Sequence, residues 1–291
     1  MSVPSLPTGM STGIPMTEGE FQLLRQFICD QAGILYEEGT SYLLRRRLQP
    51  RLEALGLHSF HDYYRFLTDP SIAPDVRMRE VEELLERVVT RETYFFRESC
   101  QLDAFRNGLL PLLHRKQGRN GHLNIWSAGC ATGEEPYTLA IHVLASGLFH
   151  PANVQILGTD LSRSALEVAR AAVYGPSSFR QADFQLVECY FRRVPGGRRV
   201  IDEVKRMVTF HHLNLLDPNW QLPIERFDVI FCRNVLIYLD RTVRGVVIRR
   251  LSDRLVRGGY LLLGHSEWLG DVAYPLEALY VKRQLVYRKP P

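Results

Sequence analysis

The residues that point most directly to chemistry form a loop of small side chains closed by two acids, SAGCATGEE at 127–135. Gly129 and Gly133 would let a ligand approach the backbone closely. A dinucleotide fingerprint would read G-x-G-x-x-G and a P-loop would carry a lysine, and this loop has neither. Glu134 and Glu135 follow at once and would repel a phosphate. The loop therefore favours a ligand that lacks phosphate and carries positive charge.

A further carboxylate lies where a ribose would need one. The run VQILGTD predicts a strand that ends at Asp160, the next strand after the loop. In open α/β sheets ligands bind at the carboxyl ends of the strands, and an acid there can bind two ribose hydroxyls. S-adenosylmethionine fits, because it joins an adenosyl group to a sulfonium and an ammonium and has no phosphate. The alternative is that Gly129 and Gly133 shape a tight turn while the glutamates complement a helix dipole.

The elements that must position these groups change character near Gly121. Before it the pattern predicts helices, the first opened by Thr17 and Glu20 at capping-box spacing. A second helix is expected from Ser41 toward Gly56, with Pro50 expected to bend or divide it. Three more helical segments follow, FHDYYRFL, DVRMREVEELLERVV and CQLDAFRNGLLPLLHRK, the last with a proline expected to kink it.

After Gly121 short apolar runs alternate with helices, which predicts the α/β class and a doubly wound parallel sheet. The final run ALYVKRQLVYRK predicts an antiparallel strand pair added at one edge. YFRRVPGGRRVI interrupts the alternation with a Pro-Gly-Gly turn, so we expect a small β insertion at about 186–206.

The composition limits the class of protein to which the chain can belong. The chain has 291 residues, 45% apolar and 23% charged, with a net charge of +4, as in an ordinary globular protein. No run reaches the ~18 apolar residues of a membrane span, and the N-terminus does not resemble a secretory signal. The five cysteines are odd in number and form no C-x-x-C, so neither a disulfide framework nor a metal site is expected. We expect a cytoplasmic protein without membrane insertion, with a flexible N-terminus over 1–16.

Several motifs together carry a family resemblance. SAGCATGEEPY, FCRNVLIYLD, TYFFRE, GHSE and RLQPRLEALGL resemble blocks of the chemotaxis receptor methyltransferases, from about residue 17 onward. That resemblance implies a helical substrate-recognition domain at 17–90 and an interdomain linker and helix at 91–120. It also implies a Rossmann-like class I methyltransferase domain at 121–291 with a small antiparallel β-subdomain inserted. Members methylate glutamate side chains on the cytoplasmic helical bundle of chemoreceptors, using S-adenosylmethionine and releasing S-adenosylhomocysteine.

The resemblance also assigns roles to residues. Glu135 would meet the methionine part of the cofactor, Asp160 the ribose, and Tyr238 would lie close to the transferred methyl. Arg97 and Tyr238 are the residues expected to be catalytic, although Arg97 could equally bind the cofactor's carboxylate and Tyr238 could be a core aromatic. The full cofactor-binding set implied is Thr93, Arg97, Gly129, Glu135, Asp160, Leu161, Asn214, Leu215, Asn234 and Val235.

The expected reaction does not depend on acid–base catalysis. A glutamate is already ionised at neutral pH, so methyl transfer to it needs positioning and exclusion of water, with no general base and no metal. The resemblance implies that substrate docking falls to the basic segment LLRRRLQPRL, which carries Arg45, Arg46, Arg47 and Arg51, with Arg47 and Arg51 at the positions that match the family. The alternative for these arginines is a solvated helix face.

Three other functions are alternatives. A nucleic-acid methyltransferase would usually carry an N-P-P-Y type turn where this chain reads CRNVLIY, and no basic stripe with aromatics is present, so no nucleic acid is expected. A cofactor-binding regulatory module without catalysis and a small-carboxylate methyltransferase are the other two. We expect a monomer, and the compact VPGGRR turn predicts that no receptor peptide is held by the β insertion.

Overall fold

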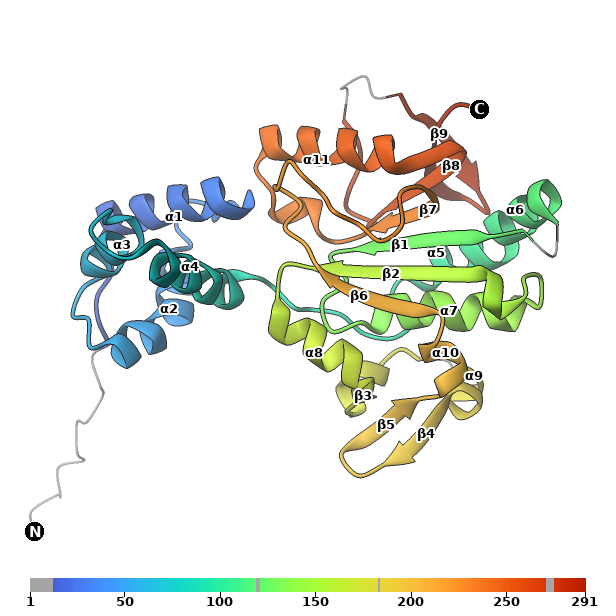
Figure 1. Ribbon diagram of the computed structural model, residues 1–291, viewed down its shortest axis with the longest axis horizontal. Coiled ribbons are helices and arrows are strands. Elements are labelled where there is room, and N and C mark those ends of the chain that lie inside the picture. The colour runs from blue at the N-terminus through green and yellow to red at the C-terminus, as the bar shows by residue number, and fades with distance from the viewer. Residues whose placement is uncertain (1–12, 119–120, 183, 271–274) are drawn as a thin grey trace, which may run out of the picture. The chain divides into compact units, whose positions relative to one another are not determined.

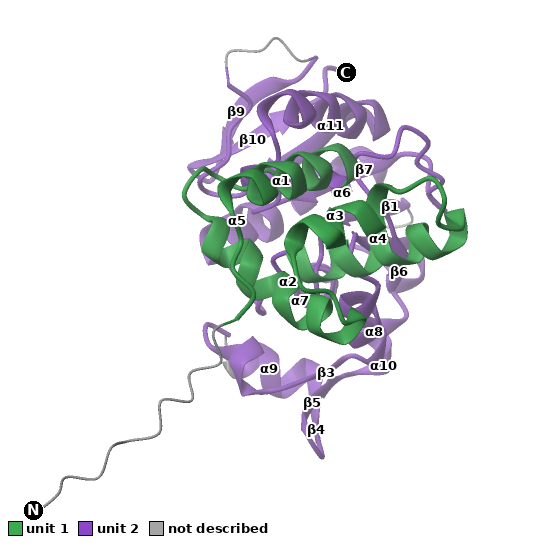
Figure 2. Cartoon of the chain, turned by 90° about the vertical axis from the view of Figure 1, so that its left-hand side faces the viewer, with its two compact units in different colours: residues 1–31, 35–88 green, residues 32–34, 89–291 purple. Residues whose placement is uncertain are grey.

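The computed structural model describes residues 13–118, 121–182, 184–270 and 275–291. The expected flexible N-terminus therefore falls for the most part outside the described residues. The chain forms two compact units, one of Met1–Gln31 with Leu35–Val88 and one of Ala32–Ile34 with Val89–Pro291 (Figure 2). None of the helices in the described ranges is both long enough and apolar enough to cross a membrane.

The first unit is helical, as the sequence predicts. The expected capping box is confirmed, since the Thr17 amide donates to Glu20 Oε2 at 2.7 Å and the Glu20 amide donates to Thr17 Oγ1 at 3.3 Å. The helices are α1 (Glu18–Ala32), α2 (Ser41–Leu55), α3 (Phe60–Thr68) and α4 (Pro74–Val88).

The sequence left open whether Pro50 bends or divides α2, and the structure shows one continuous helix, so the division is not observed. Leu44, Leu48 and Leu52 are fully buried, whereas Pro50 is exposed, so both halves are held in the core by one apolar stripe. The helix ends as predicted at Gly56, which adopts a left-handed conformation with φ 67°.

The second unit is built on a seven-stranded sheet in the order β6-β2-β1-β7-β8-β10-β9 (Figure 1). The first five strands of that order are mutually parallel and the last two add antiparallel at the edge, as predicted. The strands are β1 (Leu123–Ala128), β2 (Val154–Asp160), β6 (Val208–His212), β7 (Phe227–Cys232), β8 (Leu255–Leu263), β9 (Glu277–Val281) and β10 (Gln284–Arg288).

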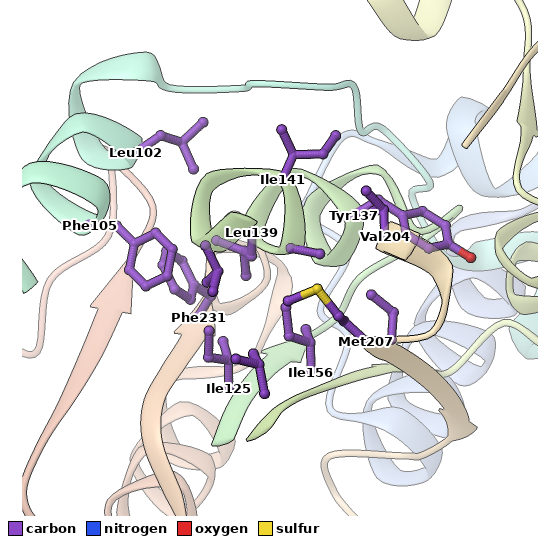
Figure 3. Packing of buried hydrophobic residues seen from close by; sticks show 14 of the residues in the cluster. Leu102, Phe105, Ile125, Tyr137, Leu139, Ile141, Ile156, Val204, Met207 and Phe231 are labelled. Carbon is purple, nitrogen blue, oxygen red and sulfur yellow. The ribbon is translucent and has the colours of Figure 1, made fainter. Parts of the chain in front are cut away.

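Alternate residues of the central strands are buried on opposite faces of the sheet. Ile125 packs in the core shared with α7 (Glu134–Ser146), and the next residue, Trp126, packs in the core shared with α11 (Arg241–Arg254). Figure 3 shows the first of these cores, where Ile125 and Phe231 lie near Leu139 of α7. Burial on both faces is the signature of a doubly wound sheet.

The remaining helices connect the strands or precede the sheet. The segment before β1 contains a π-helical stretch, and Pro111 follows it in the first turn of a new helix, where its missing N–H is tolerated. These remaining helices are α5 (Ser99–Ala104), η1 (Phe105–Leu109), α6 (Leu110–Gln117), η2 (Pro151–Asn153), α8 (Arg163–Ala171), η3 (Pro176–Phe179), α9 (Phe184–Tyr190), α10 (Asp202–Lys205) and η4 (Leu236–Tyr238).

The β insertion forms a three-stranded antiparallel sheet in the order β3-β5-β4. Strands β4 (Phe191–Val194) and β5 (Gly197–Val200) are the hairpin that the Pro-Gly-Gly turn predicts. Strand β3 (Val173–Tyr174) lies outside the expected range of about 186–206. A two-residue strand is too short to show the alternation by which a strand is recognised in a sequence.

Candidate functional site

The candidate site lies at the carboxyl ends of the parallel strands, where the loop after β1 meets the end of β2. The amides of Gly129 and Cys130 both donate to the Thr159 carbonyl, at 2.8 and 2.9 Å. The Ala131 amide donates to Asp160 Oδ2 at 2.7 Å. The structure thus brings the glycine loop and the predicted ribose ligand, Asp160, into direct contact.

The packing of the fold requires glycine at both positions of the loop. Gly129 has φ 78°, and a Cβ there would lie 2.3 Å from Val235 Cγ2. Gly133 has φ 91°, and a Cβ there would lie 2.6 Å from the Ala169 Cβ. Both glycines, which suggested the close approach of a ligand, therefore also serve the packing of the fold. The packing at Gly129 brings the loop against Val235, which the sequence analysis expects in the same site.

The two acids that close the loop are both held by specific partners. Glu134 is 2% exposed and accepts hydrogen bonds from Thr132 Oγ1 at 2.6 Å and Ser178 Oγ at 2.9 Å. Glu135 accepts from Ser127 Oγ at 2.6 Å and from Arg233 Nη1 at 3.0 Å. Burial raises the pKa of both carboxyls, and these hydrogen-bond and ion-pair partners oppose that rise.

Arg233 is a residue of this site that the sequence reasoning missed. Its side chain is 2% exposed and reaches Glu135 at 3.0 Å and Glu98 at 3.1 Å. It also donates to the Arg97 carbonyl at 2.7 Å. One guanidinium therefore ties the end of β7 to α7 and to the Arg97 segment. The available signal was an arginine directly after a strand with no exposed residue, within the motif FCRNVLIYLD.

The turn after β7 carries Asn234, Val235 and Tyr238, all expected in the site. Asn234 has φ 58°, a left-handed conformation that few non-glycine residues adopt. Tyr238 ends the short helix η4 and is 37% exposed, so it is not the core aromatic of the alternative interpretation. Glu267, also missed, binds the backbone of this turn.

Asn214 and Leu215, the pair expected on the adenine side, follow β6. The preceding amide, of Leu213, donates to the Asp160 carbonyl at 3.0 Å, which places this turn beside the end of β2. Arg250 Nη1 lies 3.5 Å from the Leu215 carbonyl and bonds the next two carbonyls at 3.0 and 2.8 Å. His212, the last residue of β6, forms a hydrogen bond through its Nε2 with the carbonyl of Leu161 at 2.9 Å.

The segment with Thr93 and Arg97 packs on α7 through its backbone. The Phe96 amide donates to Thr138 Oγ1 at 3.2 Å. The Arg97 guanidinium donates to the Glu92 carbonyl at 2.8 Å and lies 5.6 Å from the Tyr94 ring centroid. In this structure Arg97 thus contacts its own segment, while its backbone is held by Arg233.

Comparison with known proteins identifies the family. The model described as "CheR methyltransferase, SAM binding domain" matches residues 91–283, and "CheR methyltransferase, all-alpha domain" matches 19–88. This chain belongs to the CheR methyltransferase family. The resemblance seen in the sequence is thereby confirmed, as is the fold class.

Relatives of this CheR family chain agree along nearly its whole length. A "Chemotaxis protein methyltransferase" of Borreliella burgdorferi is 34% identical, with 92% of this chain and 96% of the relative covered. One of Klebsiella aerogenes is 33% identical, with 96% and 92% covered. A "Probable chemotaxis protein methyltransferase" of Rhizobium etli is 35% identical, with 82% and 89% covered.

The charges at the strand ends fit the S-adenosylmethionine-binding domain of this CheR chain. Glu98 and Glu135 share the single guanidinium of Arg233, so that cluster keeps a net negative charge when both acids are ionised. Such a cluster suits a ligand that carries a sulfonium and an ammonium. Within the described ranges, no group of three or more His, Cys, Asp or Glu side chains could hold a metal ion.

In the all-alpha domain of this CheR chain, the four arginines of α2 do not share one role. Arg45 and Arg46 are exposed. Arg51 donates to both carboxylate oxygens of Glu80, at 2.9 and 2.5 Å, and Glu80 is 3% exposed. Arg47 donates to Tyr36 Oη at 3.0 Å. A helix with a buried stripe turns neighbouring residues to different sides, so Arg45 and Arg46 are exposed while Arg47 and Arg51 are partly buried and paired within the helical unit.

Proposed function

We propose that this chain transfers the methyl group of S-adenosylmethionine to glutamate side chains on the cytoplasmic helical bundle of chemoreceptors. The observation that carries the proposal is the match of both family domains, together with relatives named chemotaxis protein methyltransferases over nearly the full chain. The acid-lined ends of β1 and β2 support it, because they suit a cationic adenosyl ligand.

The reaction is an in-line displacement. A carboxylate oxygen of the substrate glutamate forms a bond to the methyl carbon, and the bond from that carbon to sulfur breaks with its electron pair left on sulfur. The products are a glutamate methyl ester and neutral S-adenosylhomocysteine. The glutamate is ionised at neutral pH, so the protein's residues need only hold the two reactants in line and exclude water.

The residues divide the binding between them. Asp160 binds the ribose hydroxyls, Glu135 faces the methionine part, and Asn214 with Leu215 lies on the adenine side. Their support is that the structure gathers the ends of β1, β2 and β6 through backbone bonds to Thr159 and to Asp160 itself.

Arg97 and Tyr238 act on the reacting groups. Tyr238 is 37% exposed at the end of η4, so this residue is not packed into the core, which supports the role. Thr93, Gly129, Leu161, Asn234 and Val235 complete the cofactor site, each at or beside a strand end or on the segment that packs against α7.

The helical domain expected at 17–90 recognises the receptor. Arg45 and Arg46 are its docking cations, because they are exposed, whereas Arg47 and Arg51 are bound within the unit. The enzyme works as a monomer in the cytoplasm and binds no nucleic acid.

The enzyme binds its receptor without holding a tethering peptide of that receptor. Strands β4 and β5 are joined by Pro195 and Gly196 alone, which leaves little loop to close over an added strand. Calorimetric titration with peptides copied from receptor C-termini should therefore give no micromolar binding. Micromolar binding that is abolished by altering Gly196 and Gly197 would contradict this part of the proposal.

The test of the function is incubation with methyl-labelled S-adenosylmethionine and receptor cytoplasmic fragments. We expect base-labile label on receptor glutamates, since methyl esters hydrolyse in alkali, and loss of labelling when those glutamates are replaced by alanine. Cofactor binding without any transfer would instead favour a regulatory module. Label on a different protein or on a small carboxylate would replace the substrate named here.

A further inference from the structure

Glu267, in the loop after β8, holds four backbone amides at once. Its Oε1 accepts from the amides of Val235 at 2.9 Å and Ile237 at 3.1 Å. Its Oε2 accepts from Asn234 at 2.7 Å and Gly264 at 2.7 Å. The residue is 9% exposed. Each carboxylate oxygen thus accepts two N–H bonds, which leaves Glu267 engaged with backbone rather than with a ligand.

These bonds fix a turn that has little else to define it. Strand β7 ends at Cys232, so the amides that follow have no strand partner in the sheet. Asn234 is held in the left-handed region, at φ 58°, where most residues are strained. Hydrogen bonds to a charged acceptor are stronger than neutral ones, and a buried amide left without an acceptor is costly. The Glu267 carboxylate therefore sets the shape of the turn.

Gly264 makes the approach of the two loops geometrically possible. Cys232 and Leu263 are paired in register at the ends of β7 and β8, so the loops that follow lie side by side. A Cβ on Gly264 would lie 2.6 Å from Glu267 Oε2 and 2.7 Å from the Asn234 nitrogen. Any side chain at this position would push the carboxylate away from the turn.

We propose that Glu267 is a positioning residue for the methyl transfer, acting through the turn that carries Asn234, Val235 and Tyr238. This inference rests on the proposed function, which places those residues against the cofactor and the transferred methyl. The same turn packs on the glycine loop, since a Cβ at Gly129 would meet Val235. A shift of the turn would therefore disturb both the cofactor pocket and the alignment of the reacting groups.

Glu267→Gln tests the inference with minimal change of shape. Glutamine keeps the length of the side chain but replaces one oxygen by an NH2 group, so two backbone amides then face a donor. We expect kcat to fall about 100-fold, the scale of a misplaced reacting group, while KM for the receptor stays constant. The affinity for S-adenosylhomocysteine should fall about tenfold by calorimetry, the equivalent of one hydrogen bond. Glu225→Gln, an exposed matched control, should leave all three quantities unchanged.

Gly264→Ala reaches the same contact from the opposite side and does not alter the carboxylate. It should reproduce the split between kcat and KM, and it decides the question if Glu267→Gln does not fold. Wild-type affinity and wild-type kcat in a folded form of either variant would overturn the inference. Failure of the proposed function would be seen separately, as absence of receptor labelling by the wild-type protein. The affinity for S-adenosylhomocysteine would then still decide the role of Glu267.

Discussion

Replacement of Arg233 by methionine should destabilise the methyltransferase domain strongly and in a pH-dependent way. The substitution removes two contacts to carboxylates, at 3.0 and 3.1 Å, and one hydrogen bond to a carbonyl at 2.7 Å. Loss of one partner from a buried ion pair costs about 3–5 kcal/mol. The side chains of Glu135 and Glu98 are 15% and 18% exposed, so some water can reach them. We therefore expect a loss near the lower end, about 3 kcal/mol at pH 7.5.

The pH dependence follows from Glu135. Burial already raises the pKa of its carboxyl and Arg233 opposes that rise, so the variant should have a still higher pKa at this position. Just above the ordinary glutamate range, the folded variant then binds more protons than the unfolded chain does. Stability of the variant must fall as the pH rises through that window. The difference from wild type should thus be largest near neutral pH and shrink toward pH ~5.

Tryptophan fluorescence during urea unfolding is a suitable assay. All three tryptophans, Trp126, Trp220 and Trp268, lie in the methyltransferase domain, so the signal reports on that domain and not on the helical one. Arg192→Met, at an exposed arginine of the same unit, is the control and should unfold as wild type does.

Two outcomes would refute this reasoning about Arg233. One is a loss below about 1 kcal/mol, the range of exposed ion pairs, which would mean that water already screens the cluster. The other is a loss that is equal at both pH values, which would mean that Glu135 does not respond to Arg233. Addition of Glu135→Gln to the variant should recover part of the lost stability, because it removes one of the carboxylate charges that the variant leaves without a guanidinium partner.

Three further predictions concern other parts of the molecule. Asp160→Ala should weaken S-adenosylhomocysteine binding about 10–100-fold by calorimetry, since a bond to a charged acceptor is worth about 1.5–3 kcal/mol, and unchanged affinity in a folded variant would remove this residue from the site. The double variant Arg45→Glu/Arg46→Glu should raise KM for the receptor without changing Tm. Arg51→Glu should instead lower Tm, because it places a like charge against a buried carboxylate. The reverse pattern would mean that Arg51, and not the pair Arg45 and Arg46, docks the receptor. Gly129→Ala should lower both Tm and cofactor affinity, because this glycine has φ 78° and its new Cβ would meet a valine methyl at 2.3 Å, so a stable variant with normal binding would contradict the packing described.

The sequence by itself determined the features that depend on neighbours in the chain. The capping box of Thr17 and Glu20, the C-terminal glycine of α2 and the β4–β5 hairpin are local, so residue types at short spacing specify them. Alternation of strands and helices also predicted the parallel sheet, and with it the meeting of the glycine loop and Asp160 at one edge.

Only the tertiary structure decided which charged side chains are free and which are held. Arg233 and Glu135 are 98 residues apart in the chain, Glu267 and Asn234 are 33 apart, and Arg51 pairs with a glutamate 29 residues away. Nothing in the residue types of a basic run or of a motif states which partner it will meet, because such pairs form when separate elements pack together. The sequence thus located the candidate site, whereas the folded chain selected Arg233 and Glu267 as the groups that hold its loops in place.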